Sequence, residues 1–181
     1  MYIYDIFTDG ACSNNGKIDA IGGWGFVIFK DGIIISLKHG ITKNTTNNRE
    51  ELQAILQTLK ELEHIISYTD GQIQANIYTD SAYVHGICTD WGWKWQSRDW
   101  TRPGGKPIEN LDLVKSIFHY LYNNKNFQRC KVQFFKLAGH SNILGNEIAD
   151  GLATGNNKKI EKLIGRNPEI MGVHINDIYN G

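Results

Sequence analysis

One short pattern occurs twice in this sequence, each time after two apolar residues. The stretches "IFTDGA" at residues 6–11 and "IYTDSAY" at residues 77–83 both continue into Thr-Asp and a small residue. The apolar residues are typical of β-strands, so we expect one strand to end near Asp9 and another near Asp80. In α/β proteins, sites form where neighbouring strands end and their connections diverge. The pattern therefore predicts a site to which two strands each contribute a carboxylate.

The order of the predicted elements indicates a mixed α/β fold. Residues 22–41 contain two β-rich runs joined at Asp31-Gly32, a pair that is typical of hairpins. After the Thr-Asn cluster at 45–48, apolar residues recur at helical spacing, which predicts a long helix. The remaining predictions are a strand over 71–80, a short helix over 81–88, an irregular aromatic and basic segment over 91–107, a helix over 110–122 capped by Asn110, a strand over 131–137 and a helix from 145.

This order also predicts the sheet. The first three strands are consecutive, so we expect an antiparallel meander. The fourth and fifth strands are each reached through helices, which favours parallel pairing beside the first strand. The expected fold is a five-stranded mixed sheet, with three antiparallel strands and then two parallel ones, flanked by helices. Residues 1–155 are expected to form the domain, and residues 156–181, rich in Asn, Lys and Gly, a C-terminal tail of unknown role.

The composition, with 41% hydrophobic and 21% charged residues, is that of an ordinary globular protein. Cys12, Cys88 and Cys130 are widely spaced without a zinc or redox pattern, which favours a reducing compartment. The sequence shows no secretory signal and no apolar run long enough to cross a bilayer. We therefore expect a monomeric cytoplasmic protein without a membrane partner. The formal net charge of zero argues mildly against a nucleic-acid partner, whose phosphates favour a basic protein.

The two Thr-Asp motifs suggest a metal site. If their strands are neighbours, Asp9 and Asp80 lie side by side, and a positive group must balance the two charges. No Lys or Arg adjoins either residue in the sequence. Mg²⁺ suits carboxylates and water as ligands. The alternative is that each Asp begins a turn or caps a helix, which is the better explanation of either motif alone and an equally good explanation of the two together.

Three further residues are candidates for the same site. Glu51 lies in the first turn of the predicted long helix and flanks its buried side, whereas Glu50 is expected on the outer side, as a capping or helix-dipole residue. In "AGHSNILGNEIADGLA" at 138–153, Asp150 is on a predicted helix and His140 in the glycine-containing loop before it. A loop histidine near carboxylates is suited to moving protons. Taken alone, a loop histidine such as His140 is more often a solvated residue, and a surface charge is the alternative for Asp150.

Taken together, four motifs resemble type 1 ribonuclease H. They are "TDGAC", "TNNREEL", "YTDSAY" and "GHSNILGNEIADGLA", in this order, and the resemblance covers about residues 1–155. It implies a ribonuclease H-like fold and an endonuclease that hydrolyses the RNA strand of RNA–DNA hybrids, leaving 5′-phosphate and 3′-hydroxyl ends. It also implies two Mg²⁺ ions, with Mn²⁺ as a substitute, about 4 Å apart. The implied metal ligands are Asp9, Glu51, Asp80 and Asp150, and His140 is the implied catalytic histidine.

The resemblance further implies how the hybrid is bound. Asn47 and Asn48 match the paired asparagines that contact the minor groove in this family, and Arg49 follows them as it does there. The segment 91–106 occupies the place of the family's basic protrusion, which holds the DNA strand. Aromatic faces and cationic heads suit a nucleic-acid backbone. The implied substrate-binding residues of this segment are Lys94, Trp95, Arg98 and Trp100. Some tryptophans of the segment are expected instead to pack it against the domain.

Two departures and two alternatives accompany this resemblance. The loop 13–23 lacks the Pro- and Gly-rich sequence common in the family, and Ala82 stands where Gln is common. An integrase or resolvase acting on DNA is disfavoured, because those families lack the "TNNRxEL" and "GNExAD" pair. A non-catalytic module that binds RNA–DNA hybrids predicts a missing carboxylate or histidine, and none is missing.

Overall fold

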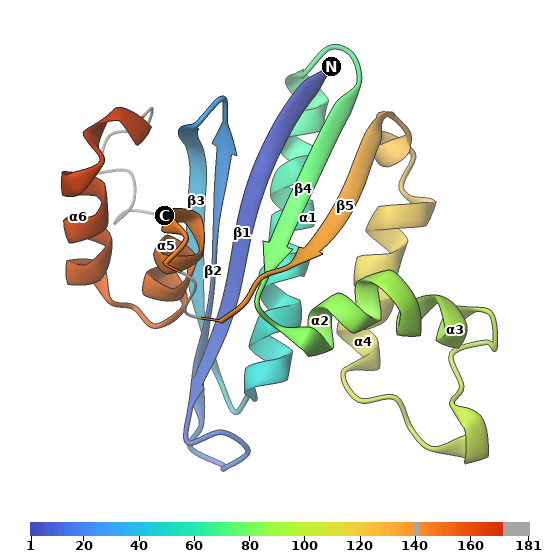
Figure 1. The fold of residues 1–181 in the computed structure, drawn as a ribbon. Coiled ribbons are helices and arrows are strands. Elements are labelled where there is room, and N and C mark those ends of the chain that lie inside the picture. The colour runs from blue at the N-terminus through green and yellow to red at the C-terminus, as the bar shows by residue number, and fades with distance from the viewer. Residues whose placement is uncertain (140–141, 172–181) are drawn as a thin grey trace.

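The computed structural model describes residues 1–139 and 142–171 and contains one mixed sheet (Figure 1). Its five strands have the order β3-β2-β1-β4-β5. Strand β1 pairs antiparallel with β2 and parallel with β4, β2 pairs antiparallel with β3, and β4 pairs parallel with β5. The predicted sheet of three antiparallel and two parallel strands is therefore confirmed.

Eleven regular elements make up the described part of the chain. The strands are β1 (Tyr2–Ser13), β2 (Ile21–Lys30), β3 (Ile33–Lys43), β4 (Ile73–Thr79) and β5 (Cys130–Lys136). The α-helices are α1 (Asn47–Tyr68), α2 (Ala82–Gly86), α3 (Gly92–Gln96), α4 (Leu111–Phe118), α5 (Leu144–Ala153) and α6 (Asn157–Arg166). Short π-helical segments cover Ile87–Trp91 and His119–Asn123, and 3₁₀ turns cover Pro103–Gly105, Lys125–Arg129 and Pro168–Ile170. Among these helices, none is long and apolar enough to span a membrane.

Strand β1 is longer than predicted, and Asp9 lies inside it rather than at its end. The parallel pairing with β4 stops at Thr8 and Thr79, but the antiparallel pairing with β2 continues to Ser13. Asp9 therefore stands where β4 leaves the sheet, and Asp80 is the first residue after β4. The two carboxylates come together as predicted, although only one of them ends a strand.

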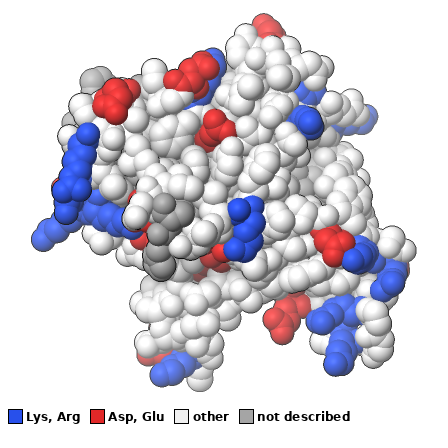
Figure 2. Space-filling view, in the orientation of Figure 1, with Lys and Arg blue, Asp and Glu red and all other residues white. Residues whose placement is uncertain are grey.

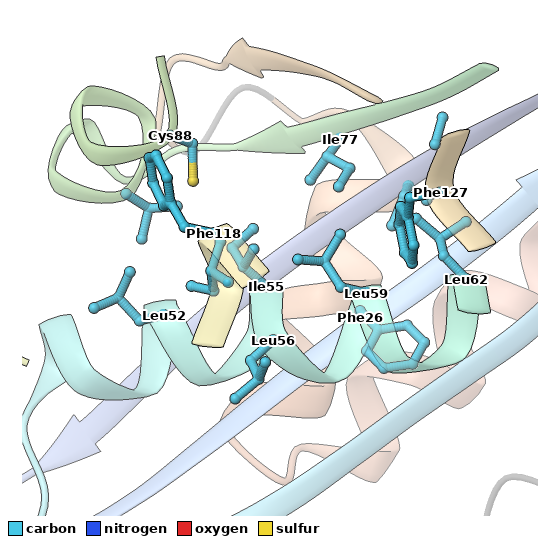
Figure 3. Packing of buried hydrophobic residues seen from close by; sticks show 14 of the residues in the cluster. Phe26, Leu52, Ile55, Leu56, Leu59, Leu62, Ile77, Cys88, Phe118 and Phe127 are labelled. Atoms are coloured by element: carbon cyan, nitrogen blue, oxygen red, sulfur yellow. The ribbon is translucent and has the colours of Figure 1, made fainter. Parts of the chain in front are cut away.

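The main core lies between the sheet and α1. Thr46 caps this helix by accepting a hydrogen bond from the Arg49 amide, which fixes where the helix begins. Leu52, Ile55 and Leu59 are fully buried at helical spacing. Figure 3 shows these side chains in one cluster with Ile77 of β4 and Phe118 of α4. This packing holds the first turn of α1 against β1.

A second core covers the opposite face of the sheet under α5 and α6 (Figure 1). Gly145 allows α5 to pack closely, because a Cβ atom there would stand 2.1 Å from the Phe7 ring. Ile160 and Ile164 of α6 are buried in this core and are only 1% and 3% exposed. Residues 157–166, part of the segment predicted to be a tail, therefore form a packed helix. The domain boundary at 155 stays a prediction, and residues 172–181 lie outside the described residues.

The region between β4 and β5 is more regular than predicted. The segment 91–107, expected to be irregular, begins with α3. The predicted helix over 110–122 is α-helical only to Phe118. Asn110 precedes α4 but does not cap it with its side chain, because its amide group donates to the Tyr83 hydroxyl at 3.2 Å and accepts from Arg49 at 3.4 Å. Asn110 thus ties α4 to α1 and α2.

The packing of α6 can be tested with one buried residue. Ile164→Ala should lower the free energy of unfolding by about 2–4 kcal/mol, because it leaves a cavity in the second core. The matched control is Lys162→Ala on the exposed side of α6, which should change it by less than about 0.5 kcal/mol. Urea unfolding followed by circular dichroism measures both. Equal effects of the two substitutions would contradict a shared core between α6 and the sheet.

Candidate active site

Three carboxylates from three elements converge at one edge of the sheet. Asp9 lies on β1, Glu51 on the first turn of α1, and Asp80 follows β4. One carboxylate oxygen of each lies within 4.8 Å of the others. The Ser81 amide donates to the Thr79 hydroxyl at 3.1 Å, and this turn holds Asp80 at the end of its strand. The convergence of Asp9 and Asp80 predicted from the two Thr-Asp motifs is present, with Glu51 beside them.

Glycine at position 10 brings α1 close enough for Glu51 to reach Asp9. A Cβ atom on Gly10 would stand 2.2 Å from the Glu51 nitrogen, so any side chain there would push the helix away. The neighbouring Glu50 is not on the outer side of the helix as predicted, since it is only 1% exposed. It accepts hydrogen bonds from Thr45 at 2.6 Å and Thr42 at 3.1 Å, which compensate for its burial. Glu50 therefore fixes the start of α1 to β3.

The close approach of the carboxylates changes their protonation. Burial, and then the negative charge of Asp80, raise the pKa of Asp9 to about 7, although the Gly10 amide donates to it at 2.8 Å. Burial and the charges of Asp9 and Asp80 raise the pKa of Glu51 well above its usual value. Two carboxyl groups thus resist ionisation in the absence of a cation.

Asp150 on α5 is the fourth predicted carboxylate. It lies close enough to Asp9 for its negative charge to raise the pKa of that residue. Its Oδ2 accepts a hydrogen bond from Lys159 of α6 at 2.5 Å. The same ammonium group lies 2.7 Å from Glu147 of α5. Asp150 is therefore beside the other carboxylates, but it already has a cationic partner.

The donor set fits a hard divalent cation. Glu51 Oε2 is buried and has no hydrogen-bond partner among the described residues. A buried carboxylate oxygen without a partner is costly, and a metal ion satisfies it. Three carboxylates within reach of one another are the ligands that Mg²⁺ or Mn²⁺ prefers. The site could therefore hold a metal ion.

Comparisons with known proteins agree with this geometry. The model of the RNase H family matches residues 3–158. This chain belongs to the ribonuclease H family. It is 36% identical over 167 residues to the ribonuclease H of Caldanaerobacter subterraneus subsp. tengcongensis, covering 92% of this chain and 96% of that protein. It is 35% identical over 164 residues to the ribonuclease H of Methylobacillus flagellatus, covering 91% and 95%. The family resemblance inferred from the four motifs is confirmed.

Solved structures of ribonuclease H domains share the fold. A type 1 RNase H, LC9-RNase H1, which has the type 2 active-site motif, superposes with a TM-score of 0.70 at 24% identity and covers 85% of this chain and 71% of its own. A foamy viral protease-reverse transcriptase in complex with RNA/DNA hybrid superposes with a TM-score of 0.67 at 21% identity. It covers 85% of this chain and 20% of its own. The ribonuclease H-like fold predicted from the sequence is confirmed.

The proposed minor-groove residues lie at the start of α1. Asn47 and Asn48 are exposed and line one surface pocket together with Asn15 of the loop 13–23. The Asn47 amide donates to the Asn15 side chain at 3.0 Å, so this loop positions the asparagine pair. Arg49 makes a bidentate ion pair with Asp112 at 2.5 Å and 3.0 Å. The role of these three residues in binding substrate stays a prediction.

The aromatic and basic segment forms the protruding corner of the molecule. Figure 2 shows Lys and Arg side chains gathered where Figure 1 places α3 and the loop after it. Lys94 and Arg98 are exposed, and Lys94 pairs with Asp90 at 2.7 Å. Trp95 and Trp100 are partly buried against the main core. Their rings thus pack this segment onto the domain, and a role of either ring toward substrate stays a prediction.

His140 lies outside the described residues. Gly139 is described, and a Cβ atom there would stand 3.9 Å from Asp80 Oδ2, so the loop reaches the carboxylates. The contact of Lys159 with Asp150 is not predicted by the sequence, because the composition from residue 156 onward indicates a tail. The signal that could have found it is the spacing of Ile160, Leu163 and Ile164, which is that of an amphipathic helix.

Substitution of Asp9 should make the metal-free protein more stable at neutral pH. A raised pKa means that the folded state keeps a proton on Asp9 which the unfolded state loses, so stability falls as pH rises from about 4 to about 7. Asp9→Asn removes this loss, which is at most ~4 kcal/mol. Thermal unfolding of both proteins with chelator should therefore diverge over this pH range and level off above pH 7. Parallel pH profiles would contradict the burial and crowding of Asp9.

Proposed function

We propose that this protein is an endonuclease that hydrolyses the RNA strand of RNA–DNA hybrids. The observation that carries the proposal is the convergence of Asp9, Glu51 and Asp80, with an unpartnered buried oxygen on Glu51, in a chain of this family. Relatives that match nearly this whole chain are named ribonuclease H. A protein that only binds hybrids would not need to hold three repelling carboxylates together.

Asp9, Glu51, Asp80 and Asp150 would hold the divalent cations. We propose Mg²⁺, two ions per site, with Mn²⁺ as a substitute. When bound, such ions activate a water and stabilise the leaving oxygen, which gives 5′-phosphate and 3′-hydroxyl ends. The protein would position the carboxylates on rigid elements and shield Glu51 from water. His140 in the loop after Gly139 is the proposed proton carrier.

The two strands of the hybrid would be distinguished by different parts of the surface. Asn47 and Asn48, next to Glu51, would contact the RNA strand, where the 2′-hydroxyl separates RNA from DNA. Arg49 would act by holding α1 and α4 together through Asp112, since both of its terminal nitrogens are engaged there. The protruding segment with Lys94 and Arg98 would hold the DNA backbone. The local basic patch resolves the conflict between a nucleic-acid substrate and a net charge of zero.

The substrate assignment is tested with four end-labelled duplexes of one sequence. In Mg²⁺, the protein should cut the RNA of the RNA–DNA hybrid and spare DNA–DNA, RNA–RNA and DNA with one embedded ribonucleotide.

Asp80→Asn should fold normally and lose cleavage, because it keeps the shape of the side chain and removes the charge of a proposed metal ligand. The control is Asp31→Asn, which makes the same chemical change at an exposed position. Substantial cleavage by Asp80→Asn, or comparable cutting of the RNA–RNA duplex, would contradict the proposal.

The basic segment makes a separate prediction about salt. Each lost phosphate contact should flatten the slope of log affinity against log salt by somewhat less than about one unit. Replacing Lys94, Arg98 and Arg102 together by Ala should therefore flatten the slope for hybrid binding in Ca²⁺, with cleavage at saturating substrate nearly unchanged. The control replaces Lys60, Lys125 and Lys131 together by Ala, so that the two triple variants have the same net charge. Equal slopes for the two triple variants would show that the segment does not contact the substrate backbone.

A further inference from the structure

Helix α6 places an ammonium group on the carboxylate cluster. Lys159 Nζ lies 2.5 Å from Asp150 Oδ2 and 2.7 Å from Glu147 Oε2. Both acceptors are on α5, one helical turn apart, so one cation bridges them. Among the described residues, the pair of Lys159 with Asp150 is the only ion pair of any of the four proposed metal ligands. Lys159 therefore balances the charge of Asp150, whereas Asp9, Glu51 and Asp80 have no ion pair within the part of the chain that the structure describes.

The position of Lys159 is built into the fold. The Asn156 side chain caps α6 by accepting from the Lys159 amide at 3.0 Å, and the next residue, Ile160, is buried in the second core. The side chain of Lys159 is 25% exposed, and those of Glu147 and Asp150 are 22% and 39% exposed. All three side chains are partly shielded from solvent, so water weakens this contact less than it weakens an ion pair between fully exposed groups.

Lys159 lies immediately after the part of the chain that the family model matches. The family model matches residues 3–158, so Lys159 is the first residue beyond it. The carboxylates of the site are inside the match, whereas the cation that pairs with Asp150 is outside it.

We propose that Lys159 is a positioning residue that competes with a divalent cation for Asp150. In the metal-free protein it holds Asp150 and limits its repulsion of Asp9. When a divalent cation binds at Asp150, the ammonium group gives up that oxygen and keeps Glu147, its second partner. The ion on the Asp150 side is therefore bound more weakly than the carboxylates alone would allow. This inference rests on the proposed function, because it takes Asp150 to be a metal ligand.

Lys159 is expected to have opposite effects on the metal-free and the metal-bound protein. Without metal, the lysine favours the folded protein, because it separates like charges. With metal, it opposes binding, because two cations then share one carboxylate. A residue that only packs α6 would stabilise both states equally, so the sign difference identifies competition.

Calorimetric titration of Mn²⁺ into metal-free protein, without substrate, tests the competition. Lys159→Met keeps the length of the stem and removes the charge, and it should tighten the binding of Mn²⁺ about fivefold, as expected for the loss of a partly exposed ion pair. Lys159→Arg should restore the wild-type affinity. The exposed neighbour Lys158→Met loses the same formal charge without a contact to the cluster and should leave the affinity within about twofold of wild type.

Thermal unfolding gives a second readout that does not depend on calorimetry. In chelator, Lys159→Met should melt ~2–4 °C below wild type, the shift expected for about 1 kcal/mol in a domain of this size. In excess Mn²⁺ it should gain more stability than wild type does, because its affinity is higher. Lys159→Gln provides the same comparison if the Met variant does not fold.

The outcomes separate the two proposals. Equal or weaker Mn²⁺ affinity of Lys159→Met, in a protein whose wild type binds Mn²⁺ and whose Asp80→Asn variant does not, would overturn the competition and leave the proposed function intact. A wild-type protein that binds no Mn²⁺ at millimolar concentration, with or without hybrid, would instead overturn the metal-dependent function itself. An increase for Lys158→Met as large as for Lys159→Met would show that only net charge matters, which also contradicts a contact at Asp150.

Discussion

The mutual repulsion of buried carboxylates is the constraint around which this molecule is arranged. Asp9, Glu51 and Asp80 have oxygens within 4.8 Å of one another, and the burial of Asp9 weakens the screening of their repulsion by water. Such a cluster persists only if the backbone beneath it is held by larger favourable interactions. Strand β1 is paired on both sides up to Thr8, and α1 is fixed by its cap and by the main core. The hydrophobic packing of the domain thus stabilises an arrangement that is electrostatically unfavourable without a cation.

The two faces of the sheet contribute to this arrangement differently. On one face, α1 brings Glu51 to the cluster, and the absence of a side chain at Gly10 sets how closely it approaches. On the other face, α5 carries Asp150, and α6 supplies Lys159 as its partner. One face therefore adds a carboxyl group without a cationic partner, whereas the other adds a carboxylate together with a positive group. Binding of a cation is expected to perturb the second face more, because an existing contact must be exchanged.

The sequence predicted the parts of the fold that local patterns determine. The two Thr-Asp motifs, the Asp31-Gly32 hairpin and the spacing of Leu52, Ile55 and Leu59 led to the correct sheet and to the convergence of Asp9 and Asp80. Prediction from the sequence failed where contacts between residues far apart in the chain determine the structure. Glu50 was placed outside because helical spacing does not show that Thr42 and Thr45 will satisfy its carboxylate. The end of β1 was misplaced because β2, not the local sequence, extends it to Ser13. Lys159 was missed because composition suggested a tail where an amphipathic helix packs.

The double pairing of β1 has a consequence for local opening of the native state. Amide hydrogens of a strand bonded on both sides exchange with solvent through large unfolding events, whereas a ten-residue helix held by Ile160 and Ile164 can detach at lower free energy. Transient detachment of α6 would carry Lys159 away while Asp9 keeps its place on the sheet. The population of that partly open form, rather than global stability, would then set how often Asp150 is free in solution.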